Sequence, residues 1–126
     1  MRNHRFNVEQ IASALHDFGI IGIWLFGSAV SGEVPDGSDV DIAILFSSKP
    51  GFDELTTCRS LLQRAMGVDN IDLVILNGAS VILRFEALSG RRMLCCDEVR
   101  CAEFASLSAR EYEDEMAQCY RALHAA

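Results

Sequence analysis

The sequence predicts an α/β fold with a small central mixed sheet flanked by helices. Two observations indicate this class. Short runs of branched and aromatic residues alternate along the chain with segments in which apolar residues recur at helical spacing. The chain has 126 residues, of which 50% are hydrophobic, and this is enough for one compact domain with a core but too short for two of ordinary size. We therefore expect one domain over residues 1–126.

The expected elements follow from periodicity and from the residues that interrupt it. Gly19 and Gly67 each stand where a helical pattern stops, and Pro50 and Gly51 break the chain before the second helix. Residues 28–38 contain several turn formers and have room for only a helical turn or two before a loop. The expected elements, in order, are a helix over 8–18, strands over 20–26 and 39–46, a helix over 52–66, a strand over 71–76, a helix over 80–88, a short strand over 91–96, and one long helix or two short ones over 98–123.

Composition and charge exclude several classes of function. The chain carries 11 basic and 18 acidic residues, for a net charge of −7, so it lacks the positive field that holds a phosphate backbone. Direct nucleic-acid binding is therefore disfavoured, and a basic partner is expected. The longest apolar run, residues 20–26, is far below the roughly 18 residues that a membrane span requires, so no membrane association is expected. The N-terminus does not resemble a secretory signal, which predicts a cytoplasmic protein.

The five cysteines do not predict a disulfide framework or a zinc site. Their number is odd, they form no C-x-x-C pair, and no histidine stands at finger-like spacing. Free thiols, mostly packed in the core, are expected. The three histidines are scattered, so no nucleophile of the Ser-His or Cys-His type is indicated.

A Gly-Ser pair follows the first predicted strand. Gly27 allows close approach of the backbone, and Ser28 can both cap a helix and bind a phosphate oxygen. Unpaired backbone N–H groups at the start of a helix form an anion site. The pair is a candidate site for nucleotide phosphates, and a plain turn with a capping serine is the alternative.

Three aspartates are candidate metal ligands. Asp39 and Asp41 stand two residues apart on a predicted strand, so their side chains project from the same face. Two carboxylates this close repel each other unless a cation lies between them, and hard oxygen ligands favour Mg²⁺. Asp72 opens the third strand and reaches the same ions if that strand neighbours the second. An exposed acidic strand edge is the alternative.

The stretch "LFGSAVSGEVPDGSDVDIAIL" followed by "NIDLVIL" resembles the nucleotidyltransferase superfamily related to DNA polymerase beta, and within it the minimal nucleotidyltransferase (MNT) domains. The resemblance is specific from residue 20 to residue 76 and looser beyond it. It implies the nucleotidyltransferase fold, with phosphates held by Gly27 and Ser28 and two Mg²⁺ ions held by Asp39, Asp41 and Asp72, the catalytic and metal-binding triad.

The resemblance also implies a reaction and a partner. MNT proteins similar to this chain commonly act as antitoxins that transfer AMP from ATP to a tyrosine of a cognate HEPN-type ribonuclease toxin. It therefore implies a Mg²⁺-dependent protein adenylyltransferase in a hetero-oligomer with that toxin. An acidic cluster over residues 111–115 either faces a basic toxin or is a solvated helix face.

Two alternatives remain open on the sequence. Many relatives have an arginine where this chain has Ala29 or Ser31, which keeps open a non-catalytic antitoxin that masks its toxin sterically. The second alternative is an adenylyltransferase that acts on a small molecule such as an aminoglycoside, although such relatives usually carry an additional helical domain. Arg84, Arg91 and Arg92 are potential triphosphate contacts, but surface positions are expected for them.

Overall fold

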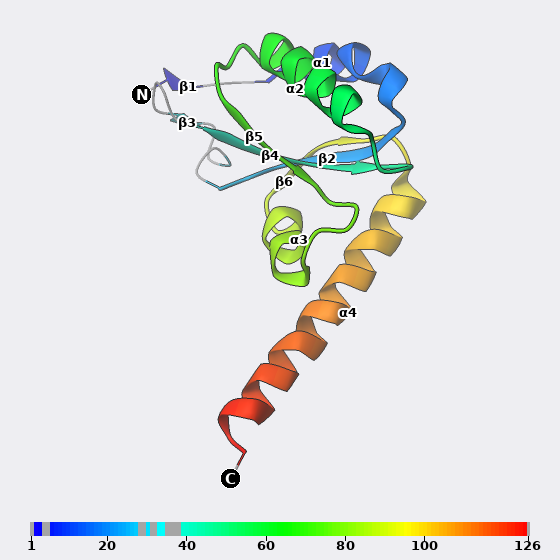
Figure 1. Ribbon diagram of the computed structural model, residues 1–126. Helices are drawn as coiled ribbons and strands as arrows, with labels where there is room; N and C mark the ends of the chain where they lie inside the picture. The colour runs from blue at the N-terminus through cyan, green and yellow to red at the C-terminus, as the bar shows by residue number, and fades with distance from the viewer. Residues whose placement is uncertain (1, 4–5, 28–29, 31–32, 35–38, 126) are drawn as a thin grey trace.

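The computed structural model describes residues 2–3, 6–27, 30, 33–34 and 39–125. Its centre is a four-stranded sheet in the order β5-β4-β2-β6 (Figure 1). β4 and β5 are parallel, and the other neighbours are antiparallel, so the sheet is mixed as the sequence predicts. The bounds of these strands are Ile20–Phe26 for β2, Val40–Phe46 for β4, Ile71–Ile75 for β5 and Arg91–Cys95 for β6.

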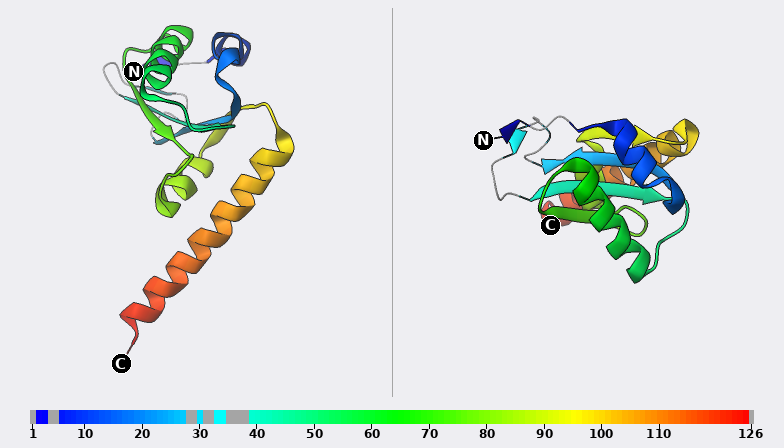
Figure 2. Two further views of the ribbon diagram at one scale, coloured as in Figure 1. Left: turned by 45° about the vertical axis from the view of Figure 1, so that its right-hand side comes forward. Right: turned by 90° about the horizontal axis from the view of Figure 1, so that it is seen from above.

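Helices cover both faces of the sheet. α1 and α2 lie over one face, whereas α3 and the beginning of α4 lie against the other, and most of α4 extends beyond the sheet (Figures 1 and 2). None of the helices in the described ranges has the length and hydropathy needed to cross a membrane. The bounds are Val8–Ala14 for α1, His16–Phe18 for the 3-10 helix η1, Phe52–Met66 for α2, Val81–Leu88 for α3 and Glu98–Leu123 for α4.

Capping side chains explain where three of the helices begin. Asn7 Oδ1 accepts a hydrogen bond from the backbone N–H of Gln10 at 3.1 Å, before α1. Ser80 Oγ accepts from Leu83 at 3.2 Å before α3, and Asp97 Oδ1 accepts from Arg100 at 3.1 Å before α4. The C-terminal helical region is thus one helix with its own cap, which decides between the two readings of the sequence.

The predicted order of elements is confirmed, with two local corrections. The helix expected over 8–18 ends at Ala14 and continues as the tighter η1, since Leu15 leaves the α-helical conformation at φ −107° and ψ 10°. The segment 28–38, expected to hold only a helical turn and a loop, contains β3 at Glu33–Val34, which pairs antiparallel with β1 at Arg2–Asn3. Strands of two residues carry no periodic pattern, so sequence reasoning could not find them.

The sheet separates two apolar clusters. Alternate residues of β4 point to opposite faces, so Ile42 and Ile44 pack with α1 and α2, whereas Ala43 and Leu45 pack toward α3 and α4. The first cluster is the larger and contains Leu62 of α2. Asp39 and Asp41 have the same parity as Ala43, so the carboxylates fall on the α3 and α4 face.

Candidate functional site

The register of the sheet brings the predicted site residues to one end of three strands. Asp41 pairs with Phe26 at the end of β2 and with Asp72 near the start of β5. Because β4 and β5 are parallel neighbours in this register, Asp41 and Asp72 project to the same face of the sheet. Asp39 is the exposed residue immediately before β4. The site therefore forms where β2 ends and β4 and β5 begin.

The carboxyl of Asp41 is the centre of a negative cluster. Partial burial raises its pKa above the ordinary value of 3.8, and the charge of Asp72 and the hydrogen bond that protonated Asp41 donates to Asp72 raise it further. The charges of Asp39 and Glu86 act in the same direction. This is the electrostatic signature of a site that gains from a bound cation, since a positive charge would relieve the repulsion.

Gly27 lies directly against that carboxyl. Its φ of +71° is a left-handed conformation that residues with a side chain rarely adopt, and the Oδ2 atom of Asp41 occupies the place where a Cβ would stand. A side chain at this position would displace the carboxyl. Glycine is therefore required at this position for two reasons, the turn after β2 and the packing of the Asp41 carboxyl.

Ser28, the other predicted phosphate ligand, lies outside the described residues. The described residues contain no group of three carboxylate, thiol or imidazole side chains arranged to hold a metal ion. Asp41 and Asp72 are in contact, whereas Asp39 acts on Asp41 through its charge. The donor chemistry, oxygen atoms of acidic side chains, fits Mg²⁺. The metal triad stays a prediction.

Glu86 is the residue of this cluster that sequence reasoning missed. It is the one acidic residue of α3, and α3 packs across the end of β2 on the same face as Asp41. No local pattern marks it, because its proximity to Asp41 depends on where α3 docks on the sheet. Its charge adds to the negative potential that a cation would neutralise.

Of the three arginines with potential phosphate contacts, Arg84 and Arg92 have partners within the chain, and Arg91 is exposed at the start of β6. Arg84 pairs with Glu111, donates hydrogen bonds to Ala79 O at 3.2 Å and to Ser108 Oγ at 3.3 Å, and so joins α3 to α4. The Nη atoms of Arg92 donate to the two carboxylate oxygens of Glu98 at 3.1 and 3.2 Å. Arg84 and Arg92 thus hold α4 in place. The surface position expected for Arg84 is wrong, since its side chain is 12% exposed between α3 and α4.

Solved structures share this fold. A crystal structure of a toxin–antitoxin with AMP-PNP is 25% identical, covering 94% of this chain and 96% of that chain, with a TM-score of 0.76. A mutant of the toxin–antitoxin MntA–HpeT is 23% identical with the same coverage and a TM-score of 0.78. A chain in the structure of the tri-AMPylated Shewanella oneidensis HEPN toxin in complex with MNT antitoxin is 23% identical over 92% of both chains, with a TM-score of 0.69. A search of curated proteins finds no match.

A family model described as polymerase beta, nucleotidyltransferase, matches residues 9–99. This range is more than half of the chain and includes Gly27, Asp39, Asp41 and Asp72. The fold predicted from the sequence is thus confirmed, and these residues lie at the strand ends described above. The chain belongs to the polymerase beta nucleotidyltransferase family.

Proposed function

We propose that this chain is a Mg²⁺-dependent adenylyltransferase that moves AMP from ATP to a tyrosine hydroxyl of a cognate HEPN-type toxin and thereby acts as its antitoxin. The observation that carries the proposal is the contact between the carboxyls of Asp41 and Asp72, beside Gly27, in a member of the nucleotidyltransferase family. Similar structures support the donor and the acceptor, since one is a toxin–antitoxin with AMP-PNP and another holds a tri-AMPylated HEPN toxin.

The residues divide the work at the strand ends. The backbone at Gly27 and the hydroxyl of Ser28 bind the nucleotide phosphates, because a glycine without a Cβ permits close approach. Asp39, Asp41 and Asp72 would hold the magnesium. When bound there, Mg²⁺ supplies charge neutralisation at the phosphate oxygens and lowers the pKa of the attacking hydroxyl.

The transfer itself is an in-line displacement at phosphorus. The tyrosine oxygen forms a bond to the α-phosphorus of ATP, the bond from that phosphorus to the β-phosphate bridging oxygen breaks, and pyrophosphate leaves. Asp72 is exposed at the start of β5 and accepts the hydroxyl proton. Positioning and charge compensation by the carboxylate cluster provide most of the rate.

The C-terminal part of α4 supports a macromolecular partner. There Tyr120 is 64% exposed and Leu123 is 82% exposed, and α4 extends beyond the sheet (Figure 2). The acidic cluster of this helix complements a basic protein surface. Its free members are the exposed Glu113, Asp114 and Glu115, since Glu111 pairs with Arg84.

The experiment combines the purified chain with the protein encoded beside it, Mg²⁺ and labelled ATP. We expect AMP on a tyrosine of that neighbour, read by mass spectrometry, and loss of its ribonuclease activity. Asp41→Asn should label at least about a hundredfold more slowly. Asp53→Asn is the matched control, since Asp53 lies in the first turn of α2 on the other side of the sheet.

The outcomes separate the candidate functions. Labelling by Asp41→Asn at the parental rate would exclude the carboxylate cluster as the site of transfer. Neutralisation of the neighbour without labelling, and equally by Asp41→Asn, would establish a steric antitoxin. Labelling of an aminoglycoside in place of the neighbour would make the acceptor a small molecule.

A further inference from the structure

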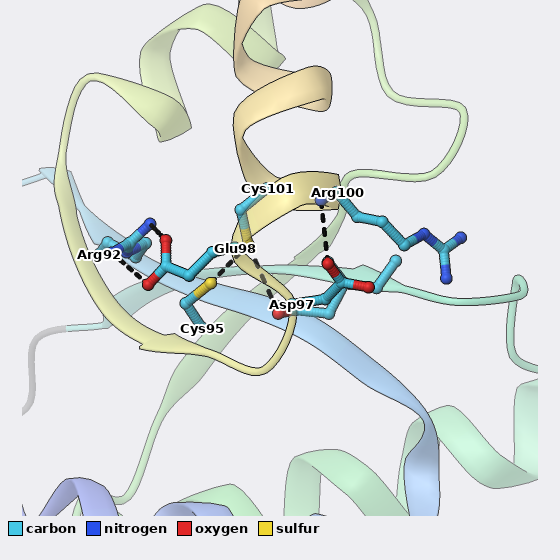
Figure 3. A network of polar contacts seen from close by, with 7 residues as sticks. Arg92, Cys95, Asp97, Glu98, Arg100 and Cys101 are labelled. Carbon is cyan, nitrogen blue, oxygen red and sulfur yellow. Dashed lines mark hydrogen bonds and ion pairs between the residues drawn. The ribbon is translucent and has the colours of Figure 1, made fainter.

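Two thiols are in contact where β6 leads into α4. Cys95, the last residue of β6, and Cys101, in the first turns of α4, have their Sγ atoms 3.1 Å apart (Figure 3). We propose that Cys95 and Cys101 form a redox modification site that closes to a disulfide on reaction with a low-molecular-weight disulfide of the glutathione type. This site lies outside the carboxylate cluster and does not depend on the proposed function.

The geometry of the junction favours closure. A disulfide bond is about 2.05 Å long, so the two sulfur atoms need to approach by roughly 1 Å. The chain on both sides is held by other contacts, because Asp97 caps α4 and Arg92 on β6 pairs with Glu98 on α4 (Figure 3). The sulfur atoms are therefore kept together, and little conformational freedom is lost when a bond joins them.

Closure leaves the buried polar groups satisfied. In the reduced state the Cys95 thiol donates to Cys101 Sγ, and the Cys101 thiol donates to the carbonyl oxygen of Ile21 at 3.5 Å. Both protons leave when the disulfide forms. The Ile21 oxygen keeps a stronger partner, the backbone N–H of Cys96 at 2.8 Å, so no acceptor is orphaned.

The accessibility of the thiols sets the order of the steps. Cys101 is 2% exposed and burial raises the pKa of its thiol to about 12, whereas Cys95 is half-buried. The Cys95 thiolate attacks one sulfur of glutathione disulfide, and one glutathione thiolate leaves. Cys101 Sγ then attacks Cys95 Sγ, its proton passes to the departing sulfur, and the second glutathione leaves as a thiol. One glutathione disulfide is reduced to two thiols, and the two cysteines are oxidised to one disulfide.

The disulfide would anchor the N-terminal end of α4. A bond from Cys95 to Cys101 ties the end of β6 to α4 covalently, where the reduced protein has an exposed ion pair and a helix cap. Trp24 provides a probe of this event, because its ring and the Cys101 sulfur border the same space above Gly22. Trp24 is the only tryptophan, so no other indole contributes to the signal.

The test treats the full chain with glutathione disulfide under native conditions, alkylates the remaining thiols and maps the peptides by mass spectrometry. In the peptides that carry Cys95 and Cys101 we expect a link and a summed mass lower by two hydrogen atoms, whereas the exposed Cys96 and Cys119 can each carry a glutathione. We also expect weaker Trp24 fluorescence and reversal by dithiothreitol. Cys95→Ser should abolish the link. Cys119→Ser should form the same Cys95–Cys101 link as the parent, because Cys119 lies near the far end of α4.

Three results would overturn the proposal: five thiols that all remain alkylatable, a glutathione adduct on Cys95 that persists, or a link that uses Cys96 instead. Cys101→Ala is the second variant, and circular dichroism confirms that both variants are folded. With Cys101 removed, we expect the Cys95 adduct to accumulate, since the attacking sulfur is gone.

Discussion

The two faces of the sheet have different compositions and different tasks. Under α1 and α2, the side chains of Ile23, Leu25, Ile42 and Ile44 are fully buried among apolar neighbours. Under α3 and α4 the apolar cluster covers only part of the face, and the strand ends carry carboxylates. One face stabilises the fold, and the other holds negative charges together at a cost in stability.

A single strand supplies both faces. In "DVDIAILF" the residues Val40, Ile42 and Ile44 belong to the apolar face, and the alternate residues begin with Asp39 and Asp41. Because the side-chain period of a strand is two, a shift of register by one residue would turn the carboxylates toward α1 and α2 and move Ile42 and Ile44 to the opposite face. The apolar face therefore fixes the position of the site.

The largest effect should come from the apolar face. Ile44 is 0% exposed, so Ile44→Ala leaves a cavity and should lower the free energy of unfolding by about 2–5 kcal/mol, whereas Ile44→Val should cost about 0.5–1.5 kcal/mol. Chemical denaturation measures both. The transfer rate of the folded fraction should stay at the parental level. A rate that falls with stability in Ile44→Val would show that the two faces are coupled.

At the strand ends, Gly27→Ala should impair transfer because its Cβ displaces the Asp41 carboxyl. A misplacement of this kind costs on the order of a hundredfold in rate. The left-handed φ adds about 1–2 kcal/mol of backbone strain. Gly67→Ala isolates the strain, since Gly67 has φ +68° and nothing within 4 Å of an added Cβ.

Thermal melts and single-turnover labelling of these two glycine variants test the assignment. Gly27→Ala should lose at least as much stability as Gly67→Ala, since it adds the contact with Asp41 to the same strain, and only Gly27→Ala should lose activity. Equal loss of activity in the two variants would mean that strain alone, and not the position of the Asp41 carboxyl, governs the rate.

The sequence was most informative where local rules set the structure. Glycine before and after residues 20–26 marked β2, and the spacing of Asp39 and Asp41 placed their side chains on one face. The meeting of Asp41 with Asp72 required β4 and β5 to be neighbours, which only the family resemblance suggested. The proximity of Glu86 to Asp41 was not predictable, because the docking of α3 depends on distant contacts such as Arg84 with Glu111.

That docking is itself testable. Arg84, 12% exposed, joins α3 to Glu111 and to the buried Ser108, so Arg84→Gln leaves both without a charged donor and should cost about 1–3 kcal/mol. Arg92→Gln breaks an ion pair that is 45% and 73% exposed and should cost at most about 1 kcal/mol. Denaturant midpoints of the two variants measure the difference. Equal costs would contradict a structural role of Arg84 between α3 and α4.

The smallest expected effect is a gain in stability, in the variant Asp41→Asn. The pKa of Asp41 is raised in the folded state. At pH values between 3.8 and that folded-state pKa, the native protein therefore binds more protons than the unfolded chain. Stability is therefore lost as pH rises through the folded pKa, owing to Asp72, Asp39 and Glu86 nearby. Asp41→Asn removes the charge that is repelled.

With a chelator present, Asp41→Asn should be more stable than the parent at pH 7 by about 0.5–1 kcal/mol, a modest gain because solvent screens a partly buried carboxyl. The gain should shrink as pH falls toward 3.8, where the parental carboxyl is protonated as well. Asp53→Asn should show no gain, since Asp53 stands in the first turn of α2, where a negative charge is favourable. Urea denaturation across this pH range distinguishes the cases. A destabilised Asp41→Asn at pH 7 would mean that this carboxyl supports the fold, and that the division between a stabilising face and a destabilised functional face is wrong.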